Sequence, residues 1–296
     1  MIQRVPFTKM HGLGNDFVII DDLKAETFAS SQTKVQDFAT QFAQKICNRR
    51  LGVGADQVLW LKKPINGPIN GLGSHDARME ILNADGSVAE MCGNGIRAVA
   101  LYLNRHSAVS KLQYRIETLA GTQIVNLVEN DEVKVDMGRP GLGNRSTEGE
   151  LLSILSKGKT REFRFYEVSM GNPHAVIFMD QISEGIPEAS LLEEIGPLIE
   201  THSRFPKRTN VEFVKILSST KIQVRVWERG AGATLACGTG ACAAAVASIL
   251  TGRTQSLVEA ALPGGNLQIE WQKGSSHVLM KGPATEVFQG TYLFEL

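Results

Sequence analysis

Two copies of one short motif decide the fold of this chain. Cys92-Gly93-Asn94-Gly95 precedes the apolar run 96–101, and Cys237-Gly238-Thr239-Gly240 precedes the Ala-rich run 241–247. The two cysteines are about 145 residues apart, which is roughly the length of one domain. A cysteine just before the first turn of a helix lies in the positive field of the helix N-terminus, which favours the thiolate. Two such thiols, one in each half, suggest an acid–base group for each face of a substrate.

The segments that precede the two motifs also match each other. A strand-like segment ends nine residues before each cysteine, at Asn83 in the first half and at Glu228 in the second. Further upstream, Gly14-Asn15 and Gly171-Asn172 are Gly-Asn turns that each lead into an apolar, β-branched strand. A third, weaker match aligns the segments 56–59 and 210–213. Because the order is the same in both halves, the sequence predicts two domains of like topology.

We expect an α/β (α+β) fold of two pseudo-symmetric domains, each a curled, mostly antiparallel sheet around a central apolar helix. The Gly- and Pro-rich stretch 137–144 is the expected junction. The expected domains are 1–137, to which 283–296 returns, and 138–282. The C-terminal segment 286–294 is interpreted as two short strands joined by a turn at Gly290. A cleft between two domains is the usual place for a ligand, so we expect the active site there.

Composition excludes several classes of protein. The 296 residues carry 31 Lys and Arg against 31 Asp and Glu, so neither nucleic acid nor a membrane surface is an expected partner. No apolar run is long enough to cross a bilayer, and residues 1–6 lack the apolar core of a secretion signal. We therefore expect a cytoplasmic protein, although a plastid protein cut from a longer precursor would look the same.

The cysteines do not indicate a disulfide framework or a metal site. Four cysteines are too few for a disulfide scaffold in a chain of 296 residues. No CxxC or HExxH spacing is present, so we expect no metal. Cys47, in an amphipathic run, and Cys242, inside the second helix, are expected to be core residues. The Gly-, Pro- and Asn-rich stretch 63–74 is expected to be an exposed loop away from the chemistry.

The paired motifs suit the removal and return of an α-proton. A racemase or epimerase needs a base on one face of the Cα and an acid on the other, and Cys92 and Cys237 can serve as both. The helix N-termini add amides that can hold a carboxylate while negative charge develops on it. These amides belong to Gly93, Asn94, Gly238 and Thr239.

The motifs taken together resemble the diaminopimelate epimerase family over nearly the whole chain and in the family's order. They are 10–17 (MHGLGNDF), 83–87 (NADGS), 90–97 (EMCGNGIR), 171–174 (GNPH), 209–213 (TNVEF), 228–230 (ERG) and 236–240 (ACGTG). The resemblance implies a cofactor-independent isomerase that interconverts LL- and meso-diaminopimelate in lysine biosynthesis. It also implies a small-molecule substrate, a homodimer and a pseudo-symmetric α/β fold.

The resemblance assigns roles to particular residues. Cys92 and Cys237 would be the acid and base, with His174 near them setting their charge. Glu228 would contact the ammonium at the reacting centre, and Gln57 would give support from further away. The distal end of the substrate would be held by Asn15, Asn83, Asn172, Asn210 and Arg229, the last by pairing with its carboxylate.

Other interpretations remain open from the sequence. A proline or hydroxyproline racemase has similar CGxG motifs but usually carries His where Asn94 stands, and it has no distal end to bind. A non-enzymatic amino-acid-binding protein is another alternative, in which both thiols would be inert. Asn15 and Asn172 would then be turn formers, Glu228 and Arg229 a surface ion pair, and His174 a core residue.

Overall fold

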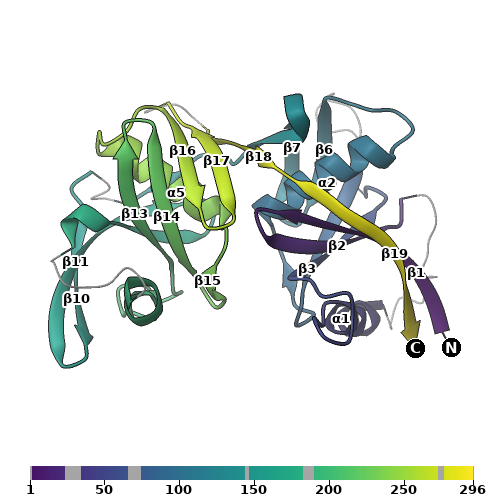
Figure 1. The fold of residues 1–296 in the computed structure, drawn as a ribbon, viewed down its shortest axis with the longest axis horizontal. Coiled ribbons are helices and arrows are strands. Elements are labelled where there is room, and N and C mark those ends of the chain that lie inside the picture. Colours follow the sequence, from purple (N-terminus) through teal and green to yellow (C-terminus); the bar gives the residue numbers. More distant parts are fainter. Residues whose placement is uncertain are drawn as a thin grey trace. The chain divides into compact units, whose positions relative to one another are not determined.

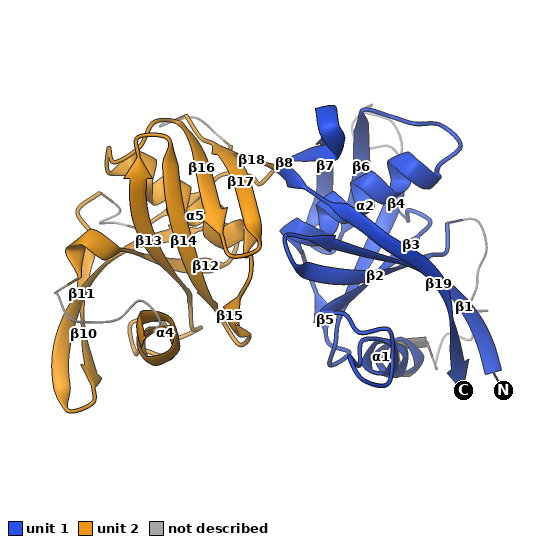
Figure 2. Ribbon diagram, viewed as in Figure 1, with its two compact units in different colours: residues 1–135, 282–296 blue, residues 136–281 orange. Residues whose placement is uncertain are grey.

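The computed structural model describes residues 2–23, 35–65, 75–143, 147–182, 190–272 and 277–295. The chain forms two compact units, Met1–Val135 with Gly282–Leu296 (unit 1) and Asp136–Lys281 (unit 2) (Figure 2). The expected loop 63–74 lies, beyond residue 65, outside the described residues.

Unit 1 is a sheet in which β19 pairs with β1, followed in turn by β2, β3, β4, β6, β7 and β8 (Figure 1). The pairs β2–β3 and β4–β6 are parallel, and the others are antiparallel. A two-residue strand, β5, forms a short hairpin with β4. The strand bounds are β1 Ile2–Gly12, β2 Asn15–Asp21, β3 Gln57–Lys62, β4 Ala77–Asn83, β5 Val88–Ala89, β6 Gln113–Thr118, β7 Gly121–Leu127, β8 Glu132–Asp136 and β19 Thr285–Glu295.

Unit 2 repeats this order, since β10 pairs with β11, followed by β12, β13, β14, β16, β17 and β18. The pairs β12–β13 and β14–β16 are parallel, β15 forms a hairpin with β14, and β9 pairs with β11. The strand bounds are β9 Gly141–Leu142, β10 Glu150–Ser156, β11 Lys159–Ser169, β12 Pro173–Phe178, β13 Asn210–Ser218, β14 Lys221–Glu228, β15 Gly232–Thr234, β16 Leu257–Leu262, β17 Gly265–Glu270 and β18 Leu279–Pro283.

A helix follows the short hairpin in each unit. These helices are α2 (Gly93–His106) and α5 (Gly238–Leu250), and every residue of α5 except Thr239 is buried. The opposite face of the sheet is covered by α1 (Val35–Ile46) in unit 1, and by η3 (Leu191–Ile195) with α4 (Gly196–Glu200) in unit 2. Two short 3-10 turns, η1 (Glu129–Asp131) and η2 (Met179–Gln181), are the remaining helical elements of the described residues. The expected α+β class, with a mostly antiparallel sheet and few helices, is confirmed.

The strand register aligns the two units residue by residue. His174 lies opposite Asn210, and Phe17 lies opposite Gln57, in the parallel pairs β12–β13 and β2–β3. Phe17 and His174 each follow their Gly-Asn turn by two residues, so Gln57 corresponds to Asn210. The third sequence match was therefore wrong by one residue.

The next inward-facing positions of the aligned strands are Leu59 and Glu212. Their neighbours Val58 and Val211 face the opposite core, so these two side chains face α2 and α5 respectively.

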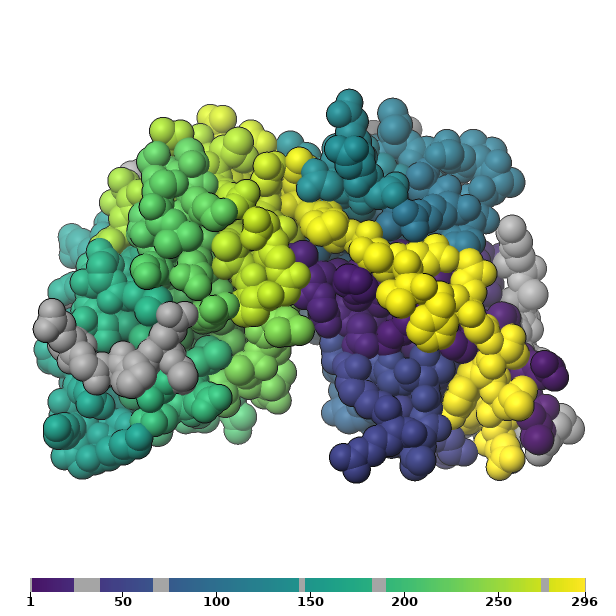
Figure 3. Space-filling view, in the orientation of Figure 1, coloured from purple at the N-terminus to yellow at the C-terminus, as the bar shows by residue number. Residues whose placement is uncertain are grey.

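The C-terminal segment is one continuous strand, so the expected turn at Gly290 was wrong. Gly290 lies opposite Phe7, and a Cβ at Gly290 would come within 2.8 Å of the Phe7 ring. The glycine is therefore needed for close packing rather than for a turn. The strand β19 runs beside β1 along the outside of unit 1 (Figure 3). Phe294, near the end of this strand, is buried against α1.

Candidate active site

Both motif cysteines are helix N-caps. The Cys92 Sγ accepts a hydrogen bond from the Gly95 N–H at 3.3 Å, and the Cys237 Sγ accepts one from the Gly240 N–H at 3.4 Å. Ser, Thr, Asp and Asn are the usual residues at this position, so a thiol in both halves is a chemical choice rather than a capping requirement. Each sulfur thus lies at the N-terminus of its helix, where the helix field favours negative charge.

The two thiols differ in their surroundings. Cys92 is partly exposed, whereas Cys237 is only 6% exposed. Burial raises the pKa of Cys237 well above its ordinary value, the negative charge of Glu228 acts in the same direction, and a charged Glu212 would do so too. The hydrogen bonds from Thr239 and Gly240 oppose this rise. At neutral pH the balance leaves Cys237 protonated, so the thiolate expected from the helix field alone is not formed there.

In unit 1, Asn15 is the side chain next to Cys92. Its Oδ1 lies 3.7 Å from the Cys92 Sγ and accepts a hydrogen bond from the Asn94 Nδ2 at 3.3 Å. Asn15 begins β2 directly after a two-residue hairpin in which both residues, Leu13 and Gly14, have positive φ. A positive φ at a leucine is strained, and the strained turn fixes the position of Asn15 at the start of β2.

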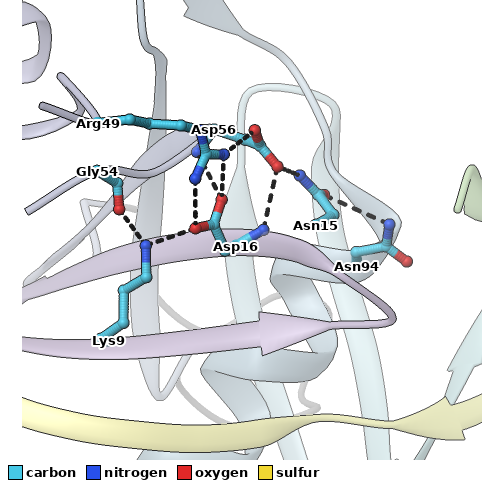
Figure 4. A network of polar contacts seen from close by, with 7 residues as sticks. All are labelled: Lys9, Asn15, Asp16, Arg49, Gly54, Asp56 and Asn94. Carbon is cyan, nitrogen blue, oxygen red and sulfur yellow. Dashed lines mark hydrogen bonds and ion pairs between the residues drawn. The ribbon is translucent and has the colours of Figure 1, made fainter. Parts of the chain in front are cut away.

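The orientation of the Asn15 amide is fixed by a carboxylate. Its Nδ2 donates to Asp56 Oδ2 at 2.8 Å (Figure 4). Because a carboxylate only accepts, the oxygen Oδ1 is the atom that faces Cys92. Asp56 is itself held by Arg49, which also binds both oxygens of Asp16. Lys9 completes the network by donating to Asp16 and to the Gly54 carbonyl.

Gln57 and Asn83 are cross-strand neighbours on β3 and β4. The Gln57 Nε2 donates to Asn83 Oδ1 at 2.9 Å, and the Asn83 Nδ2 donates to Ser87 Oγ at 2.9 Å. The two amides therefore orient each other at the end of the sheet that carries Cys92.

In unit 2, Asn172 occupies the place of Asn15, but its amide is anchored differently. Its Oδ1 lies 2.9 Å from His174 Nε2, and its Nδ2 donates to Thr239 Oγ1 at 3.3 Å. The Thr239 hydroxyl lies 3.4 Å from the Cys237 Sγ. His174 is fully buried and bound through Nδ1 to Glu212 at 2.6 Å.

Asn210, Glu228 and Arg229 lie at the end of the same sheet. The Asn210 Oδ1 accepts from the Arg229 backbone N–H at 2.9 Å, and its Nδ2 donates to the Pro173 carbonyl at 3.0 Å. Glu228 accepts from the Thr234 hydroxyl at 2.5 Å. The Arg229 guanidinium is exposed and donates to the Lys207 carbonyl.

Each unit thus gathers its share of the predicted site residues around one N-capping thiol. Unit 1 contains Cys92, Gly93, Asn94, Asn15, Gln57 and Asn83, and unit 2 contains Cys237, Gly238, Thr239, Asn172, His174, Asn210, Glu228 and Arg229.

Sequence reasoning missed the residues that hold this set in place: Asp56, Glu212 and Arg97. Arg97 is fully buried and donates to Asn94 Oδ1 at 2.9 Å and to the Gly93 carbonyl at 3.2 Å. The sequence did contain a signal for Glu212, because this charged residue stands between Val211 and Phe213 in an otherwise apolar strand.

The described residues offer neither a metal site nor a membrane-spanning helix. They contain no group of three His, Cys, Asp or Glu side chains placed to hold a metal ion. None of the helices in the described ranges is long and apolar enough to cross a bilayer.

The arrangement of strands and helices in the two units defines a class of fold that other solved structures share. A hydroxyproline epimerase from Agrobacterium vitis superposes with a TM-score of 0.66 over 98% of this chain and 91% of that chain, at 15% identity. A PhzF-family phenazine biosynthesis protein from Bacillus anthracis also gives 0.66, over 98% of this chain and 99% of that one, at 14% identity. At these identities the likeness concerns the fold alone.

Sequence similarity identifies the family within this class. The family model for diaminopimelate epimerase matches residues 7–142 and 166–287. The diaminopimelate epimerase of Carboxydothermus hydrogenoformans is 49% identical over 97% of this chain and 98% of its own length. That of Synechocystis is 43% identical over 96% of this chain and 97% of its own length. The chain belongs to the diaminopimelate epimerase family, and its members are isomerases.

Proposed function

We propose that this chain interconverts LL- and meso-diaminopimelate by a two-base mechanism in which Cys92 and Cys237 act on opposite faces of one Cα. The observation that carries the proposal is the pair of N-capping thiols at equivalent positions of the two units. One sulfur, as thiolate, takes the α-proton, and the electron pair of the broken C–H bond stays on the substrate. The other thiol then delivers its proton to the opposite face, which inverts the centre.

The helix N-termini stabilise the intermediate. The N–H groups in the first turn of a helix point outward along its axis, so the N–H groups that begin α2 and α5 can bind the substrate carboxylate. Gly93, Asn94, Gly238 and Thr239 supply them. The negative charge that develops on the carboxylate lies in the field of both helices, and no cofactor is required as an electron sink.

The remaining polar residues bind the rest of the substrate. Glu228 accepts the ammonium of the reacting centre. The positive charge of that ammonium also opposes the factors that raise the pKa of Cys237, so substrate binding helps to form the thiolate. The distal amino-acid end is held by Asn15, Asn83, Asn172, Asn210 and Arg229, with Gln57 supporting Asn83.

We further propose that the protein is a cytoplasmic homodimer. Within each chain, unit 1 and unit 2 are separate domains. Free thiols in both motifs suit a reducing compartment.

The test is hydrogen exchange at the α-carbon in deuterated water. The parent protein should incorporate deuterium into both LL- and meso-diaminopimelate during interconversion, without added cofactor. Cys92→Ala and Cys237→Ala should each abolish interconversion, whereas Cys47→Ala, which changes a core thiol, should retain it if the variant folds. Proline serves as the matched substrate control, and racemisation of proline in place of diaminopimelate would refute the proposal.

A further inference from the structure

Unit 2 buries an ionisable pair where unit 1 is apolar. His174 and Glu212 are both completely buried, and they face α5 from the adjacent parallel strands β12 and β13. The corresponding residues in unit 1 are Phe17 and Leu59, which are also completely buried. Since one copy of the unit folds with two hydrocarbon side chains here, the fold itself does not require a charged pair at these positions.

The Glu212 carboxyl group is held directly behind the Cys237 motif. A Cβ at Gly240 would lie only 2.8 Å from Glu212 Oε1, so the carboxyl group touches the first turn of α5. Oε1 is bound to His174 Nδ1, while Oε2 is a buried atom with no hydrogen-bond partner among the described residues. A carboxylate with one unsatisfied oxygen is costly in such a place, and burial raises the pKa of Glu212.

An ionised Glu212 beside a neutral His174 would leave the buried pair with a negative charge. Burial therefore favours the state in which the pair holds one more proton and has no net charge. With that proton on the Glu212 carboxyl group, Oε1 donates to His174 Nδ1 and the imidazole hydrogen lies on Nε2. Nε2 then donates to Asn172 Oδ1. The other ionisable groups facing the pair are Glu228 from β14 and Cys237 at the start of α5. The negative charge of Glu228 also favours retention of the proton.

The direction of this hydrogen bond sets the next two. Once Asn172 Oδ1 is the acceptor, its Nδ2 donates to Thr239 Oγ1. The Thr239 hydroxyl has a single hydrogen, which is then directed at the Cys237 Sγ, 3.4 Å away. Together with the Gly240 N–H, the sulfur accepts two hydrogen bonds, which stabilises its thiolate form. In unit 1 the carboxylate of Asp56 turns the Asn15 amide the other way, with its oxygen toward Cys92.

We propose that Glu212 is a positioning residue for Cys237: with His174 it stores one proton and, through Asn172 and Thr239, directs a hydroxyl hydrogen at the sulfur. The inference rests on the proposed function in that Cys237 is taken to be an acid–base group. Its test measures the thiol itself and needs no substrate.

The experiment is alkylation of the full-length protein with iodoacetamide across pH, read by peptide mass spectrometry, which follows Cys237 and Cys92 in one sample. Glu212→Leu removes the partner of His174 Nδ1, so the hydrogen on Nε2 and the orientation of the Asn172 amide are no longer enforced. The Thr239 hydrogen is then no longer directed at the sulfur, and the apparent pKa of Cys237 should rise. At a pH below that pKa, its alkylation rate should fall by about tenfold for each pKa unit. Glu212→Gln keeps a donor for Nδ1 and should stay within about threefold of the parent, by the same relation. The Cys92 profile should be unchanged in both variants and reports on folding.

A double-mutant cycle with Thr239→Val separates positioning from a structural effect. If Glu212 acts through the Thr239 hydroxyl, Glu212→Leu should have no further effect in the Thr239→Val background. Leu59→Ala, a core change at the equivalent place in unit 1, should leave the Cys237 profile unaltered.

Several results would overturn the inference. A fall in the Cys237 pKa in Glu212→Leu would mean that Glu212 acts only through its charge. The inference would also be refuted if Glu212→Leu and Glu212→Gln changed the apparent pKa of Cys237 equally, or if neither changed it. Additive effects of Glu212→Leu and Thr239→Val on this pKa would refute it as well. If the variants behave as expected but diaminopimelate shows no exchange, the proposed function fails while the positioning role of Glu212 stands.

Discussion

Asp16→Asn should destabilise unit 1 by a predictable amount that depends on pH. Burial raises the pKa of Asp16, but the hydrogen bonds and charges of Arg49 and Lys9 outweigh it and lower this pKa from 3.8 to about 2. One pKa unit corresponds to about 1.4 kcal/mol, and Arg49 is 57% exposed, so solvent weakens its share. We therefore expect a loss of roughly 2 kcal/mol at pH 7.

The sign of the pH dependence follows from the lowered pKa. The stabilisation is complete above the unfolded value of 3.8 and is lost as pH falls through about 2. The difference between the parent and Asp16→Asn should therefore be constant from pH 7 to pH 5 and should shrink to roughly half by pH 3.

Urea unfolding, followed by the fluorescence of Trp60, measures this difference in unit 1. Trp60 is buried in that unit, and replacement of Trp227 and Trp271 by Phe removes the signals of unit 2. The control is Asp131→Asn, which breaks an ion pair between Arg105 and a half-exposed Asp131 and should cost less than about 0.5 kcal/mol. Equal losses in the two variants, or a difference that does not fall with pH, would refute the reasoning.

Three further predictions concern the surroundings of the thiols. Asp56→Ala leaves the Asn15 amide free to rotate and should lower kcat/KM for diaminopimelate by roughly tenfold or more. The reason is that a hydrogen bond to a charged group contributes about 1.5–3 kcal/mol. An unchanged kcat/KM in steady-state kinetics would contradict this role of Asp56. Gly240→Ala should lower the melting temperature more than Gly95→Ala does. The Cβ added at Gly240 meets the buried Glu212 carboxyl oxygen at 2.8 Å, whereas the Cβ added at Gly95 meets a Leu59 methyl at 3.2 Å. If calorimetry shows the reverse order, the contact with Glu212 is not as close as described. Arg97→Met removes donors to Asn94 and Gly93, so it should slow alkylation of Cys92 relative to Cys237 in the same sample, and equal slowing of both would indicate general disruption.

The sequence predicted those features that repeat or that follow from local chemistry. The duplicated CGxG motifs located both N-capping cysteines, and the Ala-rich run 241–247 indicated the buried helix α5. The Gly-Asn turns placed Asn15 at the first residue of β2 and Asn172 directly before β12, and both are inner strands. Each of these depends on neighbours within a few residues, which a sequence displays directly.

Residues whose role depends on a distant partner were not predicted. Asp56 lies about 40 residues from Asn15, and Glu212 about 40 from His174, so only the parallel pairing of their strands brings them together. The turn predicted at Gly290 failed for a related reason. The local sequence allows a turn there, and only the Phe7 ring on the neighbouring strand requires a residue without a side chain.

The position of β19 has a consequence for the order in which the chain can fold. Unit 1 is discontinuous, because its outer strand β19 is synthesised after the whole of unit 2, whereas unit 2 is a single continuous segment. The first part of unit 1 therefore emerges first from the ribosome but cannot complete its sheet or bury Phe294 against α1 until β19 has been synthesised as well. We expect unit 2 to mature first, leaving the β1 edge transiently open, and a chain truncated before residue 285 to expose that edge permanently as a site for aggregation.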